Sequence, residues 1–204
     1  MAKSAFLSSG FLTIAFVSLL IVFIIHVTGF TLPIWTTVNL NVMISEYSLQ
    51  SEYHIGLWQD SFCIHVYGKL ACSTVPKHES TGIIKAVQIL ETFALTGLLV
   101  SVVLSFILIF IRQTGTLKLL NIAFVCSSGI FIIIGVIVYG LFCNGDTEET
   151  MSYVTSVLNT LNVSSNSMKL GTSFILSTIA GSLCLFLCTF LFIIEFRRNE
   201  VEAA

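Results

Sequence analysis

Charged residues and proline are scarce in this chain. Asp, Glu, Lys and Arg make up 10% of the 204 residues, there are two prolines, and hydrophobic residues make up 55%. An ordinary soluble domain needs a far more charged surface than this composition can supply. No cluster of basic residues is present, so we expect no nucleic-acid partner. The composition predicts an integral membrane protein.

The sequence also lacks the motifs of enzymes and cofactor-binding proteins. It contains no nucleophile paired with a base at a recognisable spacing, no glycine-rich phosphate loop and no metal-ligand motif. His54, His65 and His78 share one polar stretch, but their spacing matches no zinc motif. We therefore expect no enzyme activity, no cofactor and no metal site.

Four apolar runs are long enough to cross a membrane as helices, which takes about 20 residues for a hydrocarbon core of about 30 Å. They cover residues 5–27, 84–111, 117–142 and 170–194. The first run is longer than the apolar part of a signal peptide, and no clear cleavage site follows it, so we interpret it as a retained first span. Residues 1–204 are thus predicted to form a single four-span membrane domain, an all-α transmembrane bundle.

Lysine and arginine predict the orientation of these spans. The short N-terminus, the second-to-third connection and the C-terminal tail are the most basic segments, with Lys3, Arg112, Lys118, Arg197 and Arg198. The positive-inside rule therefore places both termini in the cytoplasm of a multi-pass plasma-membrane protein. Residues 31–81 and 143–169 become the two extracellular loops.

The two loops carry more acids than bases. Against Lys69, Lys77 and Lys169, and Lys85 at the start of the second apolar run, stand the acidic residues Glu46, Glu52, Asp60, Glu79, Asp146, Glu148 and Glu149. If these loops line an ion path, fixed negative charge favours cations. The plainer interpretation is that the acids keep an exposed surface soluble.

Two cysteines in the first loop bracket a hairpin-like segment. Residues 63–72 alternate between apolar and polar side chains around Tyr67 and Gly68. A two-residue turn there pairs Cys63 with Cys72 and brings the two sulfurs within bonding reach. A disulfide requires an oxidising compartment, which agrees independently with the extracellular placement.

The rest of the first loop also has the pattern of strands. Residues 38–44 place apolar side chains at even positions, and residues 53–58 repeat the alternation. We expect a small extracellular antiparallel sheet that needs the disulfide because it is too small to be stable alone. In the second loop, residues 164–169 could add one further strand. Apolar residues at helical spacing within residues 151–161 predict an extension of the third helix or a short separate helix.

These residues together resemble the signature of the claudin superfamily, which also includes peripheral myelin and epithelial membrane proteins and some channel-accessory subunits. The signature is Trp35 after the first span, then Gly56-Leu57-Trp58, then the two cysteines of the hairpin. Lys85 falls where claudins commonly have a basic residue. The resemblance implies a claudin-like fold, with structural roles for these residues. The spacing from Trp58 to the first cysteine is longer than usual, which indicates a divergent member.

The resemblance implies two functions. The first is a cell-contact protein that forms or modulates intercellular junctions or adhesion by self-association of its extracellular sheet, in cis or in trans. The alternative is an accessory subunit that docks laterally on an ion channel or receptor and tunes its trafficking or gating. Membrane lipid is a partner under both hypotheses. Residues 199–204 lack the Tyr-Val ending by which many claudins bind PDZ domains.

Other residues have a plain and a functional interpretation. Glu91 lies in the outer part of the second apolar run, at the expected membrane boundary. We interpret it as a hydrogen-bonded structural acid, with a group in an ion pathway as the alternative. Asn162 begins an Asn-Val-Ser sequon and is a candidate N-glycosylation site.

The remaining cysteines and small residues are expected to serve packing. Cys126, Cys184 and Cys188 are interpreted as small buried hydrophobes, and Cys143 as a thiol without an obvious partner. A stripe of small residues at Ser173, Ser177 and Gly181 predicts close helix packing within the bundle.

Overall fold

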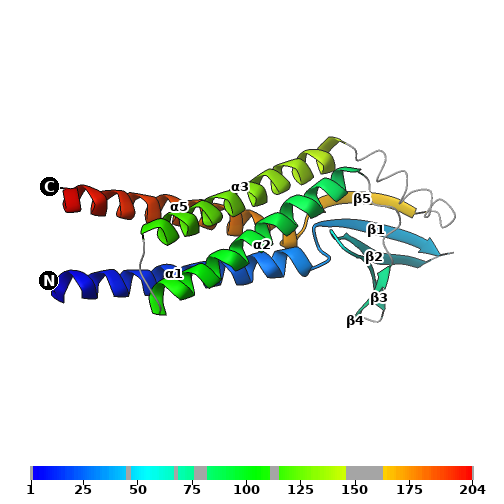
Figure 1. Cartoon of the computed structure of the whole chain (residues 1–204). Helices are drawn as coiled ribbons and strands as arrows, with labels where there is room; N and C mark the ends of the chain where they lie inside the picture. Colours follow the sequence, from blue (N-terminus) through cyan, green and yellow to red (C-terminus); the bar gives the residue numbers. More distant parts are fainter. Residues whose placement is uncertain are drawn as a thin grey trace. The chain divides into compact units, whose positions relative to one another are not determined.

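Four long apolar helices make up most of the protein. The computed structural model describes residues 2–44, 47–66, 69–75, 82–110, 115–145 and 163–203. Its helices are α1 (Ala2–Thr31), α2 (Gly82–Phe110), α3 (Gly115–Gly145) and α5 (Thr172–Ala203) (Figure 1). Each contains a segment long and apolar enough to cross a membrane, with mean hydropathy from 2.3 to 2.7. The predicted four-helix membrane fold is confirmed, whereas the single domain over residues 1–204 stays a prediction.

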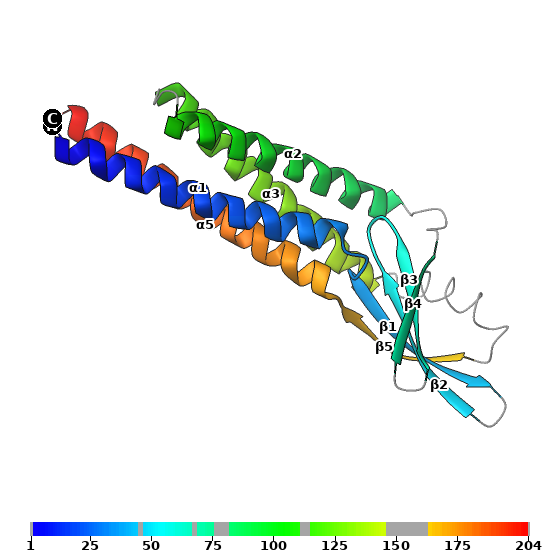
Figure 2. The ribbon, with the colours of Figure 1, turned by 90° about the horizontal axis from the view of Figure 1, so that it is seen from below.

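Five antiparallel strands form one sheet. They are β1 (Thr36–Ile44), β2 (Tyr47–Ile55), β3 (Asp60–Val66), β4 (Lys69–Val75) and β5 (Val163–Leu170). Their order is β4-β3-β2-β1-β5, so that β5 completes a sheet whose other strands are consecutive (Figure 2). The further strand expected from residues 164–169 is therefore present, paired with β1.

The register of the predicted hairpin is confirmed. Cys63 pairs with Cys72, and the pairs continue to Val66 opposite Lys69. The two cysteines form a disulfide that joins β3 to β4. The expected turn at Tyr67 and Gly68, and the helix expected within residues 151–161, lie outside the described residues.

The second expected strand is wrong in its bounds. The alternation over residues 53–58 predicts a strand there, but β2 ends at Ile55 and β3 begins at Asp60. Gly56 donates its backbone N–H to the Asp60 carboxylate, with N to Oδ1 at 3.2 Å. This side-chain bond closes a turn between the two strands. The start of β2 contains Ser48, Gln50 and Ser51, whose polar character conceals the strand in the sequence.

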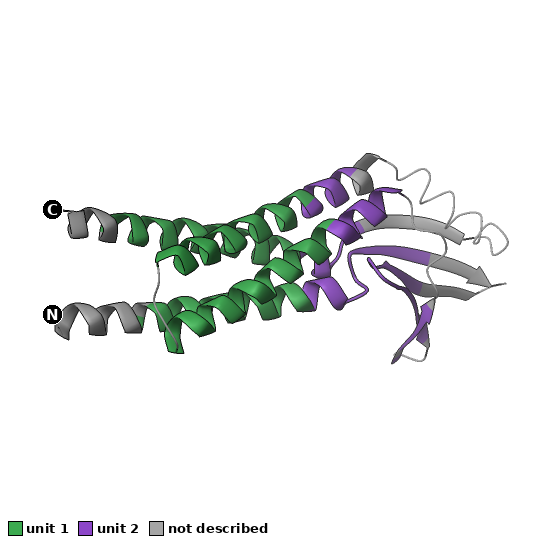
Figure 3. Cartoon of the chain, in the orientation of Figure 1, with its two compact units in different colours: residues 1–27, 90–134, 177–204 green, residues 28–89, 135–176 purple. Residues whose placement is uncertain are grey.

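The chain divides into two compact units. Unit 1 comprises Met1–Val27, Leu90–Ile134 and Ser177–Ala204, and unit 2 comprises Thr28–Ile89 and Gly135–Leu176 (Figure 3). Unit 1 is helical. Unit 2 contains the sheet and the adjoining segments of the four helices.

Unit 1 packs through narrow stripes on its helices. On α2, buried positions recur every three or four residues, at Glu91, Ala94, Leu98, Ser101, Ser105 and Leu108. Large side chains between them, such as Phe93 and Val103, are exposed, as expected for a surface facing lipid. The apolar character extends around the whole helix, so composition alone does not reveal the packed face.

Small residues bring α3 and α5 close together in unit 1. A Cβ on Gly181 would lie 2.9 Å from side-chain carbons of Ile132 and Ile133. The Cys184 thiol donates to the Val125 carbonyl oxygen at 3.0 Å. These contacts agree with the small-residue stripe expected to pack within the bundle.

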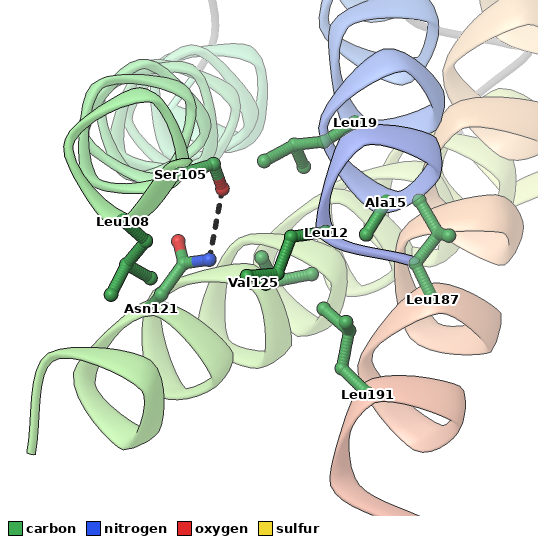
Figure 4. A pocket seen from close by; sticks show the side chains of 9 residues that line it. All are labelled: Leu12, Ala15, Leu19, Ser105, Leu108, Asn121, Val125, Leu187 and Leu191. Carbon is green, nitrogen blue, oxygen red and sulfur yellow. Dashed lines mark hydrogen bonds between the residues drawn. The ribbon is translucent and has the colours of Figure 1, made fainter. Parts of the chain in front are cut away.

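A small apolar cavity lies among the helices of unit 1. Its volume is about 20 Å³, and it is lined by side chains from α1, α2, α3 and α5 (Figure 4). Two of its lining residues are polar: the Asn121 amide donates to the Ser105 hydroxyl, with Nδ2 to Oγ at 2.9 Å. A space of this size holds at most about one water molecule. It is therefore no site for a larger ligand.

Candidate functional site

Trp35 is the centre of a buried cluster in unit 2. Its side chain is fully buried, and the indole Nε1 donates to the Gly29 carbonyl oxygen at 3.1 Å. The Tyr139 ring meets it edge-on, with centroids 4.9 Å apart. Leu57 and Val87 complete the core of this cluster, which we call the Trp35 cluster. The buried indole is therefore satisfied both by packing and by a hydrogen bond.

Backbone hydrogen bonds of Trp35 connect the start of β1 to β2 and to Gly171. The Trp35 N–H donates to the Ile55 carbonyl oxygen at 2.9 Å, and Gly171 N–H donates to the Trp35 carbonyl oxygen at 2.8 Å. Thr36 Oγ1 and Tyr139 Oη share a hydrogen bond of 3.0 Å. Segments far apart in the sequence are thus joined around one residue.

The Gly56-Leu57-Trp58 motif forms the turn between β2 and β3. A Cβ on Gly56 would overlap the Gln59 carbonyl oxygen and lie 2.6 Å from Pro33 Cα, so no larger residue fits without movement. Leu57 is buried, and its carbonyl oxygen accepts a 2.6 Å hydrogen bond from Gln88 Nε2. Trp58 is 46% exposed, with its ring against Phe30 at a centroid distance of 5.1 Å.

Asp60 is a structural acid of this turn. Its carboxylate is largely buried and accepts hydrogen bonds from Gly56 N–H at 3.2 Å and from Tyr53 Oη at 3.1 Å. In the sequence, Asp60 was counted with the acids of an exposed surface. In the structure, its carboxylate instead holds the turn closed by accepting these two hydrogen bonds.

The two faces of the sheet differ in character. One face buries Val38, Leu40 and Ile55, with Tyr53 and Phe62 packed against them. The strand register places Glu52 and the disulfide on the other face, because Glu52 pairs with Cys63. One face is therefore a small apolar core, and the other is polar.

Glu52 lies between two histidines on the polar face. Its Oε2 is 3.6 Å from His54 Nε2, and its Oε1 is 3.9 Å from His65 Nε2. Thr37 Oγ1 is hydrogen-bonded to His54 Nδ1 at 3.1 Å, which orients that ring. Within the described ranges, no three His, Cys, Asp or Glu side chains come close enough together to hold a metal ion.

The other residues singled out in the sequence are not gathered into one site. Lys85 is exposed in the first turns of α2. Asn162 lies outside the described residues, and so does the Cys143 side chain. Cys126, Cys184 and Cys188 are free thiols, of which the last two are buried. Whether the motif residues have the roles implied by the resemblance stays a prediction.

Glu91 is in unit 1, where its side chain is fully buried. Its carboxylate Oε2 is 3.7 Å from Nδ1 of His26, which is also fully buried. His26 was not predicted as a site residue. The signal was present, because His26 is an ionisable side chain within an apolar run, as Glu91 is. Tyr139 and Gln88 were not predicted either, since an aromatic ring and an amide near helix ends give no specific signal.

The main feature of the described polar residues is a sheet that presents a surface. A five-stranded sheet is joined by a disulfide at one side and attached at the Trp35 cluster. The protein is thus a multi-pass membrane protein whose polar part is a disulfide-linked antiparallel sheet.

Comparison with known proteins identifies the family. The model of the PMP-22/EMP/MP20/Claudin family matches residues 15–191, which is most of the chain. The chain therefore belongs to this family, as its motif and topology predict. No individual curated protein is significantly similar to it. Membership of this family points to a non-enzymatic membrane protein.

Proposed function

We propose that this protein is a claudin-like cell-contact protein that forms or modulates intercellular junctions or adhesion through self-association of its sheet. The main support is the construction of the sheet. Among the described residues, β4 and β5 each pair with one neighbour only, so each leaves one edge of the sheet open. Open strand edges carry unpaired backbone groups that can pair with another chain.

Strand β4 is the better candidate for a contact. Its residues Lys69 and 71–74 are exposed, and the disulfide holds the strand on β3. A strand held in place before contact loses less conformational entropy on binding than a free segment does. Self-association through this edge, within one membrane or between two, would need only backbone hydrogen bonds between β4 and a strand of the second copy.

The proposed location is the plasma membrane, with the sheet outside the cell and both termini inside. The disulfide favours an oxidising compartment for the sheet, and the basic residues favour a cytoplasmic side for the termini. A tag at the C-terminus should be invisible to antibody on intact cells, whereas a tag near Glu148 should be labelled. The reverse pattern would overturn this topology.

Charged substitutions on β4 test the contact. Ala71→Lys combined with Ser73→Lys should abolish mixed-cell aggregation and the gain in transepithelial resistance, because like charges repel when two edges approach. His65→Lys is the matched control, since His65 is exposed on β3, which has neighbours on both sides. Unchanged aggregation and resistance in the double variant, with normal surface delivery, would contradict the proposed edge.

Cross-linking in native membranes separates this function from the alternative. Contacts between copies of the chain should dominate if the protein acts by self-association. If one ion channel or receptor dominates the cross-linked partners, the accessory-subunit function is the correct one.

A further inference from the structure

Two histidines and one acid lie together on the polar face of the sheet, in unit 2. Glu52 and His54 are both on β2, and His65 is on β3, diagonally opposite Glu52. The carboxylate lies between the two rings: its Oε2 is 3.6 Å from His54 Nε2, and its Oε1 is 3.9 Å from His65 Nε2. We call these three residues the histidine–carboxylate group. Each imidazole therefore has a carboxylate oxygen of its own facing it.

The ligand that suits this group is a proton. Within the described residues, no three such side chains converge in the way that the ligands of a metal ion must. Histidine, in contrast, needs no further ligand to bind a proton, and its charge ordinarily changes between about pH 5 and pH 8. The charge of the group is therefore expected to depend on pH in this range.

The surroundings of His54 suit both the neutral and the charged ring. Its side chain is only 11% exposed, so a charge there needs compensation, which the facing carboxylate of Glu52 supplies. A charged ring donates from both nitrogens. Glu52 Oε2 faces Nε2, and Thr37 Oγ1 is 3.1 Å from Nδ1 and can accept from it. For the neutral ring, the Thr37 hydroxyl can donate to Nδ1 instead. His54 can thus gain a proton without rearrangement of the strands.

The other charged residues of the five strands do not face the two rings. Lys169 lies on the same face, on β5, but it is two strands away from His54, or about 10 Å. Asp60 and Lys69 occupy positions of the opposite face. Lys85 on α2 is the remaining charged residue of unit 2 among those that the structure describes. Glu52 is thus the one described acid at ion-pair distance from the rings.

We propose that His54, His65 and Glu52 form a proton-operated charge switch, which changes this part of the polar face from negative at neutral pH to positive in weak acid. With both rings neutral, Glu52 gives the group a charge of −1, and two added protons change it to +1. Lys169 contributes the same charge in both states. An ion or a second chain that approaches this face therefore meets local charge of opposite sign at the two pH values. This inference does not depend on the proposed function.

Proton uptake by the purified full-length protein tests the switch directly. Between about pH 8 and pH 5, the wild type should take up about two more protons than the His54→Gln/His65→Gln variant, because each ring gains one. Each single variant should lose about one proton of uptake. Glutamine is a suitable replacement because its amide is polar and does not titrate in this range. A difference of one proton or less would overturn the proposal, since one ring would then stay neutral and the charge would not change sign.

Charge-selective labelling tests the local charge itself. Thr74→Cys places a thiol on the same face, two strands or about 10 Å from His54, because Thr74 pairs with Ser61 and Ser61 with His54. Methanethiosulfonate reagents of opposite charge report the local potential through the ratio of their labelling rates, in which the ionisation of the thiol cancels. From about pH 8 to pH 5, the ratio of anionic to cationic labelling should rise about fivefold at about 0.01 M salt and about twofold at about 0.15 M.

The same thiol in the His54→Gln/His65→Gln background is the matched control, and most of the pH dependence should be lost there. Protein without the introduced cysteine gives the background from the free thiols, and mass mapping checks that Cys63 and Cys72 are still joined. A ratio that does not change with pH, or that changes equally in both backgrounds, would overturn the proposal. If the Thr74→Cys variant does not fold, the proton count still decides.

Discussion

The two units of this protein are stabilised in different ways. Unit 1 relies on narrow packed stripes and small residues, and many of its large apolar side chains are exposed. Unit 2 relies on directional contacts: a ladder of strand hydrogen bonds, a disulfide, a buried acid and the Trp35 cluster. Lipid is as apolar as a helix interior, so close fit and buried polar side chains distinguish the packed face in unit 1. A small sheet in water buries too little apolar surface to be stable by packing alone, so it needs specific bonds such as the disulfide.

The strongest test of this contrast is the loss of Trp35. Trp35→Ala should destabilise unit 2 by about 3–5 kcal/mol, because it removes a fully buried side chain that packs on Tyr139 and donates to Gly29. Hydrogen exchange and protease cleavage of the sheet are the measurements. Trp58→Ala is the matched control, since Trp58 is 46% exposed, and it should have a much smaller effect. Equal effects of the two variants would contradict the assignment of Trp35 as the centre of the cluster.

Removing the disulfide should have the next largest effect. Cys63→Ser or Cys72→Ser should destabilise the sheet by about 2–4 kcal/mol while all four helices still insert, with retention in the endoplasmic reticulum as the cellular phenotype. The double variant should match the single variants, because one bond is lost in each case. Mass mapping of the mature protein with and without reductant checks the bond itself. Two free thiols in that map would be incompatible with the structure.

Much of the fold could be predicted because local patterns carry it. Four apolar runs predict four helices, and the alternation around Tyr67 and Gly68 predicts the pairing of Cys63 with Cys72. The bounds of β2 could not be predicted in this way. They depend on the Asp60 side chain, whose carboxylate accepts the Gly56 N–H and closes the turn, and the alternation of apolar and polar residues does not indicate that contact.

Contacts between distant segments were the least predictable part of the candidate site. Gln88 binds the Leu57 carbonyl oxygen, and Tyr139 packs on Trp35, but neither residue has a sequence pattern that names its partner. Glu91 was recognised as unusual, whereas its placement opposite His26 depends on how two helices pair. Helices that are apolar all round give no periodic signal for that pairing.

Two glycines ten residues apart sharpen the contrast between the units. A Cβ on Gly171, in unit 2, would overlap the Ile34 carbonyl oxygen, which belongs to the backbone. A Cβ on Gly181, in unit 1, would lie 2.9 Å from Ile132 Cγ2 and Ile133 Cδ1, which are side-chain and not backbone atoms. Gly171→Ala should therefore cost about 1–3 kcal/mol. Gly181→Ala should cost less than Gly171→Ala, because the gain in helix propensity, about 1 kcal/mol, partly offsets the crowding against two side chains. Thermal unfolding of both variants measures this, and a larger effect at Gly181 would reverse the comparison.

The smallest expected effect concerns charge on the polar face of the sheet, and it rests on the proposed function. Asp60 is unsuitable for this test because its carboxylate holds a turn, whereas Glu52 is partly exposed between His54 and His65. If the sheet lines a path between cells, Glu52→Gln should lower the sodium-to-chloride permeability ratio modestly, because fixed negative charge concentrates cations. The reduction should be larger at low ionic strength, where the charge is screened less. Dilution potentials across an epithelial layer measure the ratio, with surface delivery as the control. An unchanged potential at both ionic strengths would mean that Glu52 serves only the solubility and local contacts of the sheet.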